Sequence, residues 1–499
     1  MPPVENRAEM SAVPSPVAST LSGALGLLAT ALLCTACATL ATTGAETAPA
    51  KPALPAHFEQ SSSAGVVNDV APPANGDWYR GFGSDELIAL IANARAHNTD
   101  LAAAQARILQ ADSRARAAGS GLLPSVQAGG NISRSTGRSG GTTGRETDWS
   151  GLLSASYEID FWGRNRATAD SAQAMARASR SDREALRLTL ESSIASSYFR
   201  VLSLRERLTI ASDNLTTARQ VLQATEARYS AGKASAVEVA TQRAVVANAE
   251  LVLPELQQQE AAERGVLGVL SGHDPEQFDI KGLPLAALQE PAVTAGLPAQ
   301  LLTRRPDLLA AEANLAAAHA DVRAAQAAIF PTVALTANGG VQNPALQAAV
   351  LTLEGTGSTF SVGASVVQSI FDGGRRQALR AESTAREQEL LANYQTAIRN
   401  ALLDVETALS ALQHLNQQRA AQDESLAQST RAFEGAELRY RAGSSDYLSV
   451  LEAQRMLHGA RDQASAYRLA HLLALINLGK ALGGGWQAES LSASASIHR

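Results

Sequence analysis

Two stretches of the chain alternate apolar and polar residues with a period of two, which is typical of half-buried β-strands. Between Leu153 and Phe161, every second residue is apolar, and Ser, Glu or Asp stands at most positions between them. A similar alternation returns between Phe360 and Val366. Each alternating stretch therefore predicts one strand of a β-hairpin that has a polar face and an apolar face.

The partner strands are expected to be shorter and weaker, at Ser125–Ser133 and Thr332–Val341. Loops rich in Gly, Ser and Thr, at Thr136–Gly144 and Gly355–Ser358, are expected to join the strands of each hairpin. Four ordinary strands of a soluble protein are the alternative. Against that reading, each hairpin interrupts long helices and carries too little apolar surface for a β-sandwich.

Between and after the hairpins the period changes to that of helices. Arg164–Arg228 and Arg375–Arg439 are equally long, and each would extend about 98 Å as an unbroken helix. Leu208, Ala211, Leu215, Ala218 and Leu222 follow one another at steps of three and four residues. This heptad spacing predicts helices that pack side by side.

Both long helices end at a glycine that can adopt the left-handed conformation of a helix C-terminus, Gly232 in one and Gly443 in the other. A returning helix is expected after each glycine, at Ala236–Leu253 and Leu448–Leu482. The sequence therefore predicts two antiparallel helical hairpins whose turns lie far from the strands.

The two halves of the chain are a tandem duplication. Gly232 and Gly443 are 211 residues apart, and so are the last residues of the FWGR and DGGR segments, Arg164 and Arg375. Pro124 and Pro331, which precede the strands, are 207 residues apart. Landmarks in the same order at almost constant spacing predict two copies of one helix–hairpin–helix unit.

Four strands cannot close a transmembrane barrel, which needs about eight or more. An open sheet edge in lipid would leave backbone donors and acceptors unpaired, at several kcal/mol each. Transmembrane strands would therefore force several copies of the chain to pool their hairpins. Aromatic rings at the strand–helix junctions fit a membrane-interface girdle. These membrane-interface residues are Phe161, Trp162, Phe330 and Phe371.

The N-terminus predicts export from the cytoplasm. Leu21–Leu33 is an apolar run too short to span a bilayer and typical of a signal peptide. Cys37 follows Ala36, the small residue that lipoprotein signal peptidase requires, so Cys37 is the candidate lipidation site and Cys34 the poorer one. An ordinary cleaved signal with two incidental cysteines is the alternative.

These landmarks predict a division of the chain into six segments. They are a signal peptide (1–36), a lipidated tether (37–76), a first repeat (77–272; β-hairpin 125–161, coiled helices 164–253), a proline-rich linker (273–298), a second repeat (299–486; β-hairpin 332–371, coiled helices 375–482) and a C-terminal tail (487–499).

Composition and motifs argue against several other classes. The net charge of −6 is spread along the chain, and no basic stripe indicates nucleic-acid binding. The eight histidines are scattered, and neither phosphate-loop spacing nor a nucleophile elbow occurs. We therefore expect no catalytic residues, no metal site and no cofactor.

Several motifs together resemble the TolC-type outer-membrane factors, specifically the lipoprotein branch that serves resistance-nodulation-division (RND) efflux pumps. They cover nearly the whole expected mature chain in the family's order. The matching segments are YEIDFWGR (157–164), RYSAGKAS (228–235), GLPAQLLTRRPDLLAAE (296–312), IFPTVALT (329–336), IFDGGRR (370–376), YRAGSSDYLSVLEAQR (440–455) and LGGGW (482–486).

The resemblance implies a mostly α-helical fold with a membrane β-barrel part. It implies a homotrimer with a 12-stranded barrel in the outer membrane of a Gram-negative bacterium, continuous with a 12-helix periplasmic tunnel. The chain would be a passive export duct for drugs or other small toxic molecules. Its partners would be outer-membrane lipid, a periplasmic adaptor and an inner-membrane RND transporter.

The resemblance also assigns roles to residues at the turns of the helical hairpins. Tyr440 corresponds to the family's gating tyrosine, and Leu448 and Glu452 stand where that branch places an apolar and an acidic constriction ring. Gly232 and Gly443 form the tips where the adaptor docks. A core leucine and a solvated carboxylate are the alternative reading of Leu448 and Glu452.

Two other functions remain open at this point. The same duct would also suit type I protein secretion or metal efflux, and Arg304–Asp307 together with the Cys37 segment favours the drug-pump branch. In a different class, the chain would be a periplasmic coiled-coil lipoprotein with a structural role.

Overall fold

The computed structural model describes Pro55, Phe58 and residues 77–139, 142–291, 298–343 and 357–485. The chain divides into two units, Met1–Pro52 and Ala53–Arg499, and every element named below belongs to the second unit. Cys37, the expected signal peptide, nearly all of the expected tether and the expected tail lie outside the described residues.

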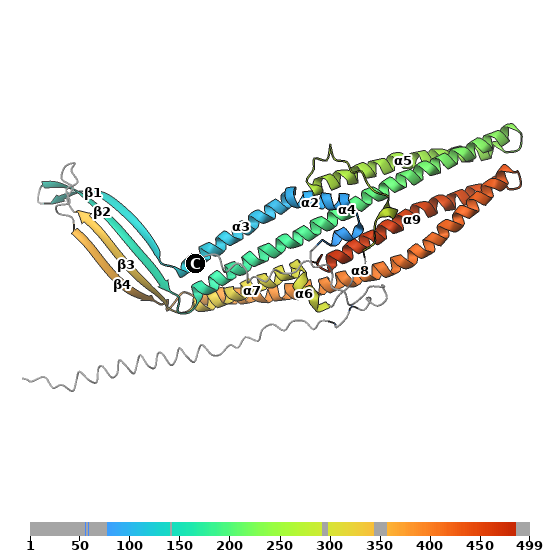
Figure 1. Ribbon diagram of the computed structural model, residues 1–499. Helices are drawn as coiled ribbons and strands as arrows, with labels where there is room; N and C mark the ends of the chain where they lie inside the picture. The colour runs from blue at the N-terminus through green and yellow to red at the C-terminus, as the bar shows by residue number, and fades with distance from the viewer. Residues whose placement is uncertain are drawn as a thin grey trace, which may run out of the picture. The chain divides into compact units, whose positions relative to one another are not determined.

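The described elements alternate helices and strands in two similar halves (Figure 1). In chain order they are η1 (Trp78–Phe82), α2 (Asp85–His97), α3 (Thr99–Gly119), η2 (Ser120–Leu122), β1 (Ser125–Ser139), β2 (Thr142–Ile159), α4 (Arg164–Ser230), α5 (Ala236–Ser271), η3 (Leu285–Ala287), η4 (Pro298–Gln300), α6 (Leu301–Arg304), α7 (Pro306–Ala327), β3 (Thr332–Asn343), β4 (Gly357–Val367), α8 (Arg375–Arg441) and α9 (Tyr447–Ala481).

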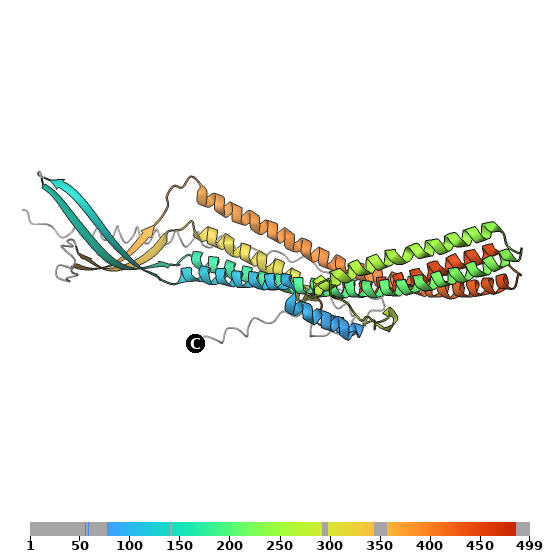
Figure 2. The ribbon, with the colours of Figure 1, turned by 90° about the horizontal axis from the view of Figure 1, so that it is seen from above.

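The two heptad-patterned stretches form the longest described helices, α4 and α8, of 67 residues each. Each turns back into a shorter helix, α4 into α5 and α8 into α9, which gives two helical hairpins. In both views the turns of the two hairpins lie at the same end of the helices, away from the strands (Figures 1 and 2). No described helix combines the length and the apolar character that a membrane span requires.

Helix α5 continues to Ser271, although the sequence predicts that it ends at Leu253, just before Pro254. Pro254 lacks an amide proton and so removes one hydrogen bond from the helix. Residues beyond the proline keep the helix in place because they pack against α4: Leu256 is buried, and Glu260 forms an ion pair with Arg205. Packing outweighs the lost bond, so the predicted end of this helix is wrong.

The four strands form one antiparallel sheet in the order β1-β2-β3-β4. Besides the two expected hairpins, β2 pairs with β3 and so joins the two halves. The register places the apolar positions of all four strands in common rows. One row contains Ala128, Leu153, Gly339 and Phe360, and the next contains Val126, Ala155, Ala337 and Val362.

This apolar face is open within one chain. Val126, Leu153, Phe360 and Val362 are more than half exposed, although soluble sheets cover such a face with a second layer. Polar residues such as Gln127, which pairs with Ser154, occupy the intervening rows. The sheet therefore has one face suited to lipid and one suited to water.

The strands are longer than the alternation predicts. β1 runs to Ser139 and β2 begins at Thr142, so most of the segment expected as the loop Thr136–Gly144 is strand. β4 begins at Gly357, within the loop expected at Gly355–Ser358. Backbone hydrogen bonds extend a ladder through Gly, Ser and Thr whether or not the side chains are apolar, so apolar content alone underestimates the strands.

Two apolar clusters hold the helices together. The larger one includes Phe82, Ile91, Tyr198, Leu267 and Val405, so it draws on η1, α2, α4, α5 and α8. The smaller one lies near the turns of the helical hairpins and joins α4 to α8 and α9. This smaller cluster supports the candidate site.

Candidate gate at the helical tips

The two turns at the helical tips have the same backbone geometry. Gly232 and Gly443 have φ angles of 70° and 78°, in the left-handed region that favours glycine. After Gly232, Lys233 N donates to Arg228 O at 2.8 Å, and after Gly443, Ser444 N donates to Arg439 O at 2.9 Å. Both pairs are the six-to-one bond of a Schellman motif, so the duplication preserved the turn itself.

A side chain at the start of each returning helix closes the turn. Ser235 accepts a bond from Glu238 N, and the Glu238 carboxylate accepts one from Ser235 N, which makes a capping box on α5. Asp446 accepts a bond from Ser449 N at 3.0 Å and from the Ser449 hydroxyl on α9. These bonds lower the pKa of Asp446 and stabilise its charged form at the helix N-terminus.

Arg228 joins the tips of the two hairpins. Its Nη1 donates to the carbonyl oxygen of Tyr440 at 2.7 Å, and its guanidinium carbon lies 4.4 Å from the centre of the Tyr440 ring. The Tyr440 hydroxyl donates to Thr225 Oγ1 at 3.3 Å. Tyr440 is buried, with 2% of its surface exposed. It therefore acts within one chain as a joint between α8 and α4.

A second polar contact lies beside the first. Tyr447, on α9, donates from its hydroxyl to Gln242 Oε1 on α5 at 2.6 Å. Gln242 in turn donates to Ala218 O on α4 at 2.9 Å. Burial raises the pKa of Tyr447 to about 12, and the nearby Tyr440 adds to the shift. Tyr447 therefore remains a neutral hydrogen-bond donor across the physiological range.

An apolar cluster lies among these contacts. Its buried members are Val221, Phe433, Tyr440, Tyr447, Val450, Leu451, Ala453 and Leu457. They come from α4, α8 and α9, so the cluster fixes the second hairpin against the first. Because the surrounding side chains are apolar, the hydrogen bonds of Tyr440 and Tyr447 are costly to break.

The structure separates the three expected gate residues. Tyr440 is buried in the joint just described, whereas Leu448 is 56% exposed and Glu452 is also exposed. Leu448 and Glu452 stand four residues apart on α9 and share one helix face. Tyr447, Val450 and Leu451 of α9 are buried, whereas Leu448 and Glu452 between and after them are exposed. Helix α9 therefore packs one face against the rest of the chain and leaves the opposite face open.

At the opposite end of the helices, aromatic residues mark the junction with the sheet. Trp162 stacks on Phe330 with ring centres 4.6 Å apart, and its Nε1 donates to Pro331 O at 2.7 Å. Phe161 and Phe371 are 66% and 90% exposed. The structure thus joins two of the four expected interface aromatics across the two halves and leaves the other two open.

An acidic residue precedes each long helix at this junction and binds amides of its first turn. Asp160 accepts from Asn165 N and Arg166 N at the start of α4, and Asp372 accepts from Arg376 N at the start of α8. A carboxylate at a helix N-terminus satisfies free amides and interacts favourably with the helix dipole. The FWGR and DGGR segments are therefore strand-to-helix junctions.

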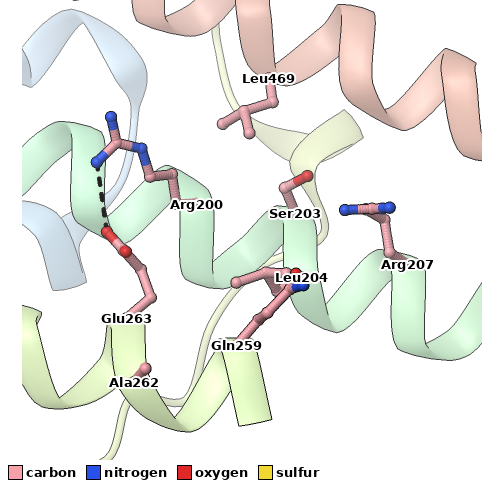
Figure 3. Close-up of a pocket in the computed structure, with 8 residues that line it drawn as sticks. All are labelled: Arg200, Ser203, Leu204, Arg207, Gln259, Ala262, Glu263 and Leu469. Atoms are coloured by element: carbon pink, nitrogen blue, oxygen red, sulfur yellow. Dashed lines mark ion pairs between the residues drawn. The ribbon is translucent and has the colours of Figure 1, made fainter. Parts of the chain in front are cut away.

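A groove of about 430 Å³ lies among α4, α5 and α9, and it is lined in part by Arg200, Arg207 and Glu263 (Figure 3). Its cations are paired: Arg200 lies 3.5 Å from Glu263, and Arg207 lies 2.7 Å from Asp462. No described group of His, Cys, Asp or Glu side chains could hold a metal ion. The groove therefore offers little free charge to a ligand.

Sequence reasoning missed the partners of Tyr440 and Tyr447. Arg228 stands in the motif RYSAG, which corresponds to RYRAG, the motif that contains Tyr440 in the second half. The duplication therefore placed Arg228 at the same position of the first tip, but it did not indicate a contact between Arg228 and Tyr440. Nothing in the local pattern distinguishes Thr225 or Gln242 from other polar residues of the coiled helices. Their role comes from the packing of one hairpin on the other.

Comparison with known proteins defines the class to which this fold and this site belong. Residues 90–272 and 297–484 match the family described as outer membrane efflux protein. The chain belongs to this family, and it is an outer-membrane channel component of an efflux system. The expected TolC-like fold and outer-membrane location are confirmed, and the structural coiled-coil alternative is not supported.

Particular relatives cover most of the chain. It is 40% identical over 421 residues to the pyoverdine export outer membrane protein OpmQ of Pseudomonas aeruginosa, covering 83% of this chain and 88% of that protein. It is 30% identical to the cation efflux system protein CusC of Escherichia coli K12, covering 87% and 94%. The solved outer-membrane channel OprN superposes with a TM-score of 0.82 at 25% identity, covering 89% and 100%. The family consists of channels rather than enzymes.

Proposed function

We propose that three copies of this chain form one continuous duct that exports small molecules through the periplasm and the outer membrane. The observation that carries the proposal is the four-stranded sheet, which exposes an apolar face and pairs neither outer edge within the described residues. Three copies would supply enough strands for a closed barrel, and closure removes the edges that lipid does not tolerate.

The energy for transport would come from partners. A periplasmic adaptor docks on the tips at Gly232 and Gly443, and an inner-membrane RND transporter loads the duct. The relative named for pyoverdine export is more similar to this chain than the relative named for cation efflux. That order supports a small organic cargo, including siderophores and drugs, over metal ions. Protein secretion has no comparable support.

The periplasmic gate of this duct would combine a joint and two rings. Tyr440 holds the hairpins of one chain together, while Leu448 and Glu452 of each copy point into the lumen. Three leucines would form an apolar constriction, and three glutamates an acidic ring one helical turn away. This arrangement is supported by the exposure of Leu448 and Glu452 on one face of α9.

Deleting the gene and measuring the sensitivity of the cells to toxic compounds tests which cargo the duct exports. We expect hypersensitivity to several organic toxicants, or loss of an exported siderophore from the medium, with normal tolerance of copper and silver. Hypersensitivity to the metals alone would reverse the assignment. Normal behaviour toward every compound, with the secreted proteins unchanged, would reject the export role.

Lipidation of Cys37 would anchor each copy and supplement the barrel. Labelling with a clickable palmitate analogue is expected to mark the wild-type protein and the Cys34→Ala variant but not the Cys37→Ala variant. Label that persists in Cys37→Ala would reject this site. Trimers of Cys37→Ala that still need detergent would show that the strands hold the membrane without the acyl chain.

A further inference from the structure

The face of the sheet that carries Leu153 continues beyond its apolar part, toward the turn between β1 and β2. That turn lies at the end of the strands that is farthest from the helices (Figure 1). Every second row of the hairpin belongs to this face, and we call its residues outward and those of the intervening rows inward. The first outward rows pair Val126 with Ala155, Ala128 with Leu153, Gly130 with Gly151 and Ile132 with Trp149.

The apolar part of the outward face has the height of a membrane core. From Ile159 to Trp149, β2 extends about 33 Å at about 3.3 Å per residue, and a strand tilt of about 40° reduces this height to about 25 Å. Transmembrane barrels have an apolar band of this height with aromatic rings at both borders. Phe161 and Trp162 follow the helix end of this span, and Trp149 stands at its other end. Trp149 therefore marks the outer border of the band.

Beyond Trp149 the outward rows change from apolar to basic. The next three outward rows pair Arg134 with Thr147, Thr136 with Arg145 and Arg138 with Thr143. They contain three arginines, which we call the outward arginines: Arg134, Arg138 and Arg145. Arg134 is exposed, and its row lies about 5 Å above that of Trp149. This is the level of the lipid headgroups.

The acidic residues of the same hairpin stand on the opposite face. Asp148 pairs with Ser133, and Glu146 pairs with Ser135, in inward rows. No carboxylate occupies the three basic outward rows. The strand alternation therefore separates the two signs of charge, as expected for a wall with anions outside it and an aqueous lumen inside it.

The register places the outward arginines close to one another. Arg134 and Arg145 stand in adjacent outward rows on neighbouring strands, and so do Arg145 and Arg138. Diagonal neighbours of this kind are about 7–8 Å apart. Like charges at this spacing repel one another unless an anion lies between them. A phosphate group suits that position, because its oxygens accept hydrogen bonds from several guanidinium groups.

We propose that the outward arginines bind the phosphate groups of lipid A, the phosphorylated glycolipid of the outer leaflet of Gram-negative outer membranes. The inference rests on the proposed barrel, because closure of the barrel turns the apolar face toward lipid. Basic clusters at the membrane border bind anionic headgroups in this way. The hydroxyls of Thr136 and Thr147, in the same rows, can donate to the remaining phosphate oxygens. The bound phosphates would fix the height of the barrel in the membrane.

The adjoining apolar surface favours a lipid over a dissolved anion. Ile132 is 79% exposed and stands in the outward row next to that of Arg134. Leu153, farther along the same face, is 55% exposed. The acyl chains of a bound lipid would cover these side chains while its phosphates meet the arginines. Inorganic phosphate, or an anionic cargo in the lumen, would gain nothing from them.

Lipid binding to the full-length, detergent-extracted trimer tests the proposal. Diphosphoryl lipid A and its dephosphorylated form are titrated separately, and native mass spectrometry counts the bound molecules. The wild type is expected to prefer the diphosphoryl form at least about tenfold. The triple variant Arg134→Gln, Arg138→Gln, Arg145→Gln should bind both forms equally. The matched control removes three exposed arginines from the helices and should keep the preference: Arg107→Gln, Arg114→Gln, Arg431→Gln.

A preference that is unchanged in the triple variant would overturn the proposal and leave the proposed duct intact. Loss of the preference in phosphate buffer, but not in chloride of equal ionic strength, would indicate a site for dissolved anions and would also overturn it. If the triple variant does not assemble, Arg134→Gln alone decides, with an expected loss of about fivefold. A wild-type chain that stays dissolved as a monomer without detergent would overturn the proposed duct as well.

A fluorescent label tests which face of the hairpin meets the headgroups. Bimane on Arg134→Cys is compared with bimane on Ser133→Cys in nanodiscs that contain lipid with a spin label on its headgroup. The parent protein, treated in parallel, gives the background from Cys34 and Cys37. Quenching should be several-fold stronger at position 134, because Ser133 stands in an inward row. Equal or reversed quenching would overturn the placement of the arginines at the lipid headgroups.

Discussion

Arg228 and Tyr440, 212 residues apart in the chain, form one joint: the arginine donates to the tyrosine carbonyl at 2.7 Å and lies over its ring at 4.4 Å. Each residue lies in the last turn of one of the two long helices, Arg228 in α4 and Tyr440 in α8. Since the Tyr440 carbonyl also accepts from Gly443 N, the same oxygen links the second turn to the first hairpin. The joint therefore couples the position of each tip to the other.

Replacing Arg228 by alanine is expected to loosen the tips without unfolding the helices. The lost cation–π contact and charge-assisted hydrogen bond contribute together about 1–2 kcal/mol at a half-buried site. Hydrogen exchange should therefore speed up by about tenfold in residues 225–240 and 440–450. Arg219→Ala, which removes an exposed ion pair with Glu250 farther along α4, is the matched control. Equal exchange in both variants would contradict the role of the joint.

Removing the hydroxyl of Tyr447 should destabilise the same region by a different route. Tyr447→Phe leaves the buried Gln242 Oε1 without its donor, which costs about 1–3 kcal/mol. The double variant Tyr447→Phe, Gln242→Leu should recover part of that loss because no polar group of the pair remains buried. Apparent melting temperatures of the four proteins of this cycle measure the coupling. Strictly additive effects would show that the two side chains do not act as a pair.

The sequence predicted the elements with repeated, long-range patterns. The heptad steps and the glycine turns placed both long helices to within two residues, because a helix of 67 residues is defined by local periodicity and a C-terminal glycine. The duplication also located the tips. The predictions that failed concern the ends of single elements. Pro254 did not end α5, and β1 continued through Thr136 to Ser139, because packing and backbone pairing decide those positions.

The candidate site was only partly accessible to the same reasoning. The motif around Tyr440 identified the right region, but its burial and its contact with Arg228 depend on the crossing of two hairpins that are distant in sequence. Likewise, the alternation of apolar and polar residues identified a hairpin before each long helix. It did not predict that β2 of the first hairpin pairs with β3 of the second. Long-range contacts of this kind have no local signature.

Glu191 is expected to be critical for stability where α2 crosses α4. Its side chain is 1% exposed and accepts from Arg95 at 2.8 Å and from Arg187 at 2.7 Å. Glu191→Gln leaves both cations without their shared anion, which should cost about 3–5 kcal/mol by the rule for breaking a buried pair. Thermal melting of the extracted protein measures the loss. Asp112→Asn, which breaks the exposed pair with Arg180, should cost less than about 1 kcal/mol.

Trp162 should be needed where the sheet meets the helices. Trp162→Phe keeps an aromatic ring against Phe330 but loses the bond to the Pro331 carbonyl, at a cost of about 1 kcal/mol. Trp162→Ala also loses the stacking and should cost about 1 kcal/mol more. Phe161→Ala is a useful contrast, because this exposed ring should affect insertion into membranes more than thermal stability. Equal melting temperatures for all three variants would contradict this division of roles.

His458 should make the distal helices sensitive to acid. Burial lowers its pKa to about 4, with the charge of Arg461 adding to the shift, and its Nε2 has no hydrogen-bond partner among the described residues. Because the folded pKa lies below the unfolded value of about 6.5, the folded state binds fewer protons between these values. Stability is therefore complete above about pH 6.5 and falls as the pH drops toward 4. Because His458 is partly exposed, solvent screening reduces the expected loss of folding free energy to about 1 kcal/mol at pH 5. His458→Gln should flatten the dependence of melting temperature on pH in this window, whereas the exposed control His414→Gln should retain the wild-type slope.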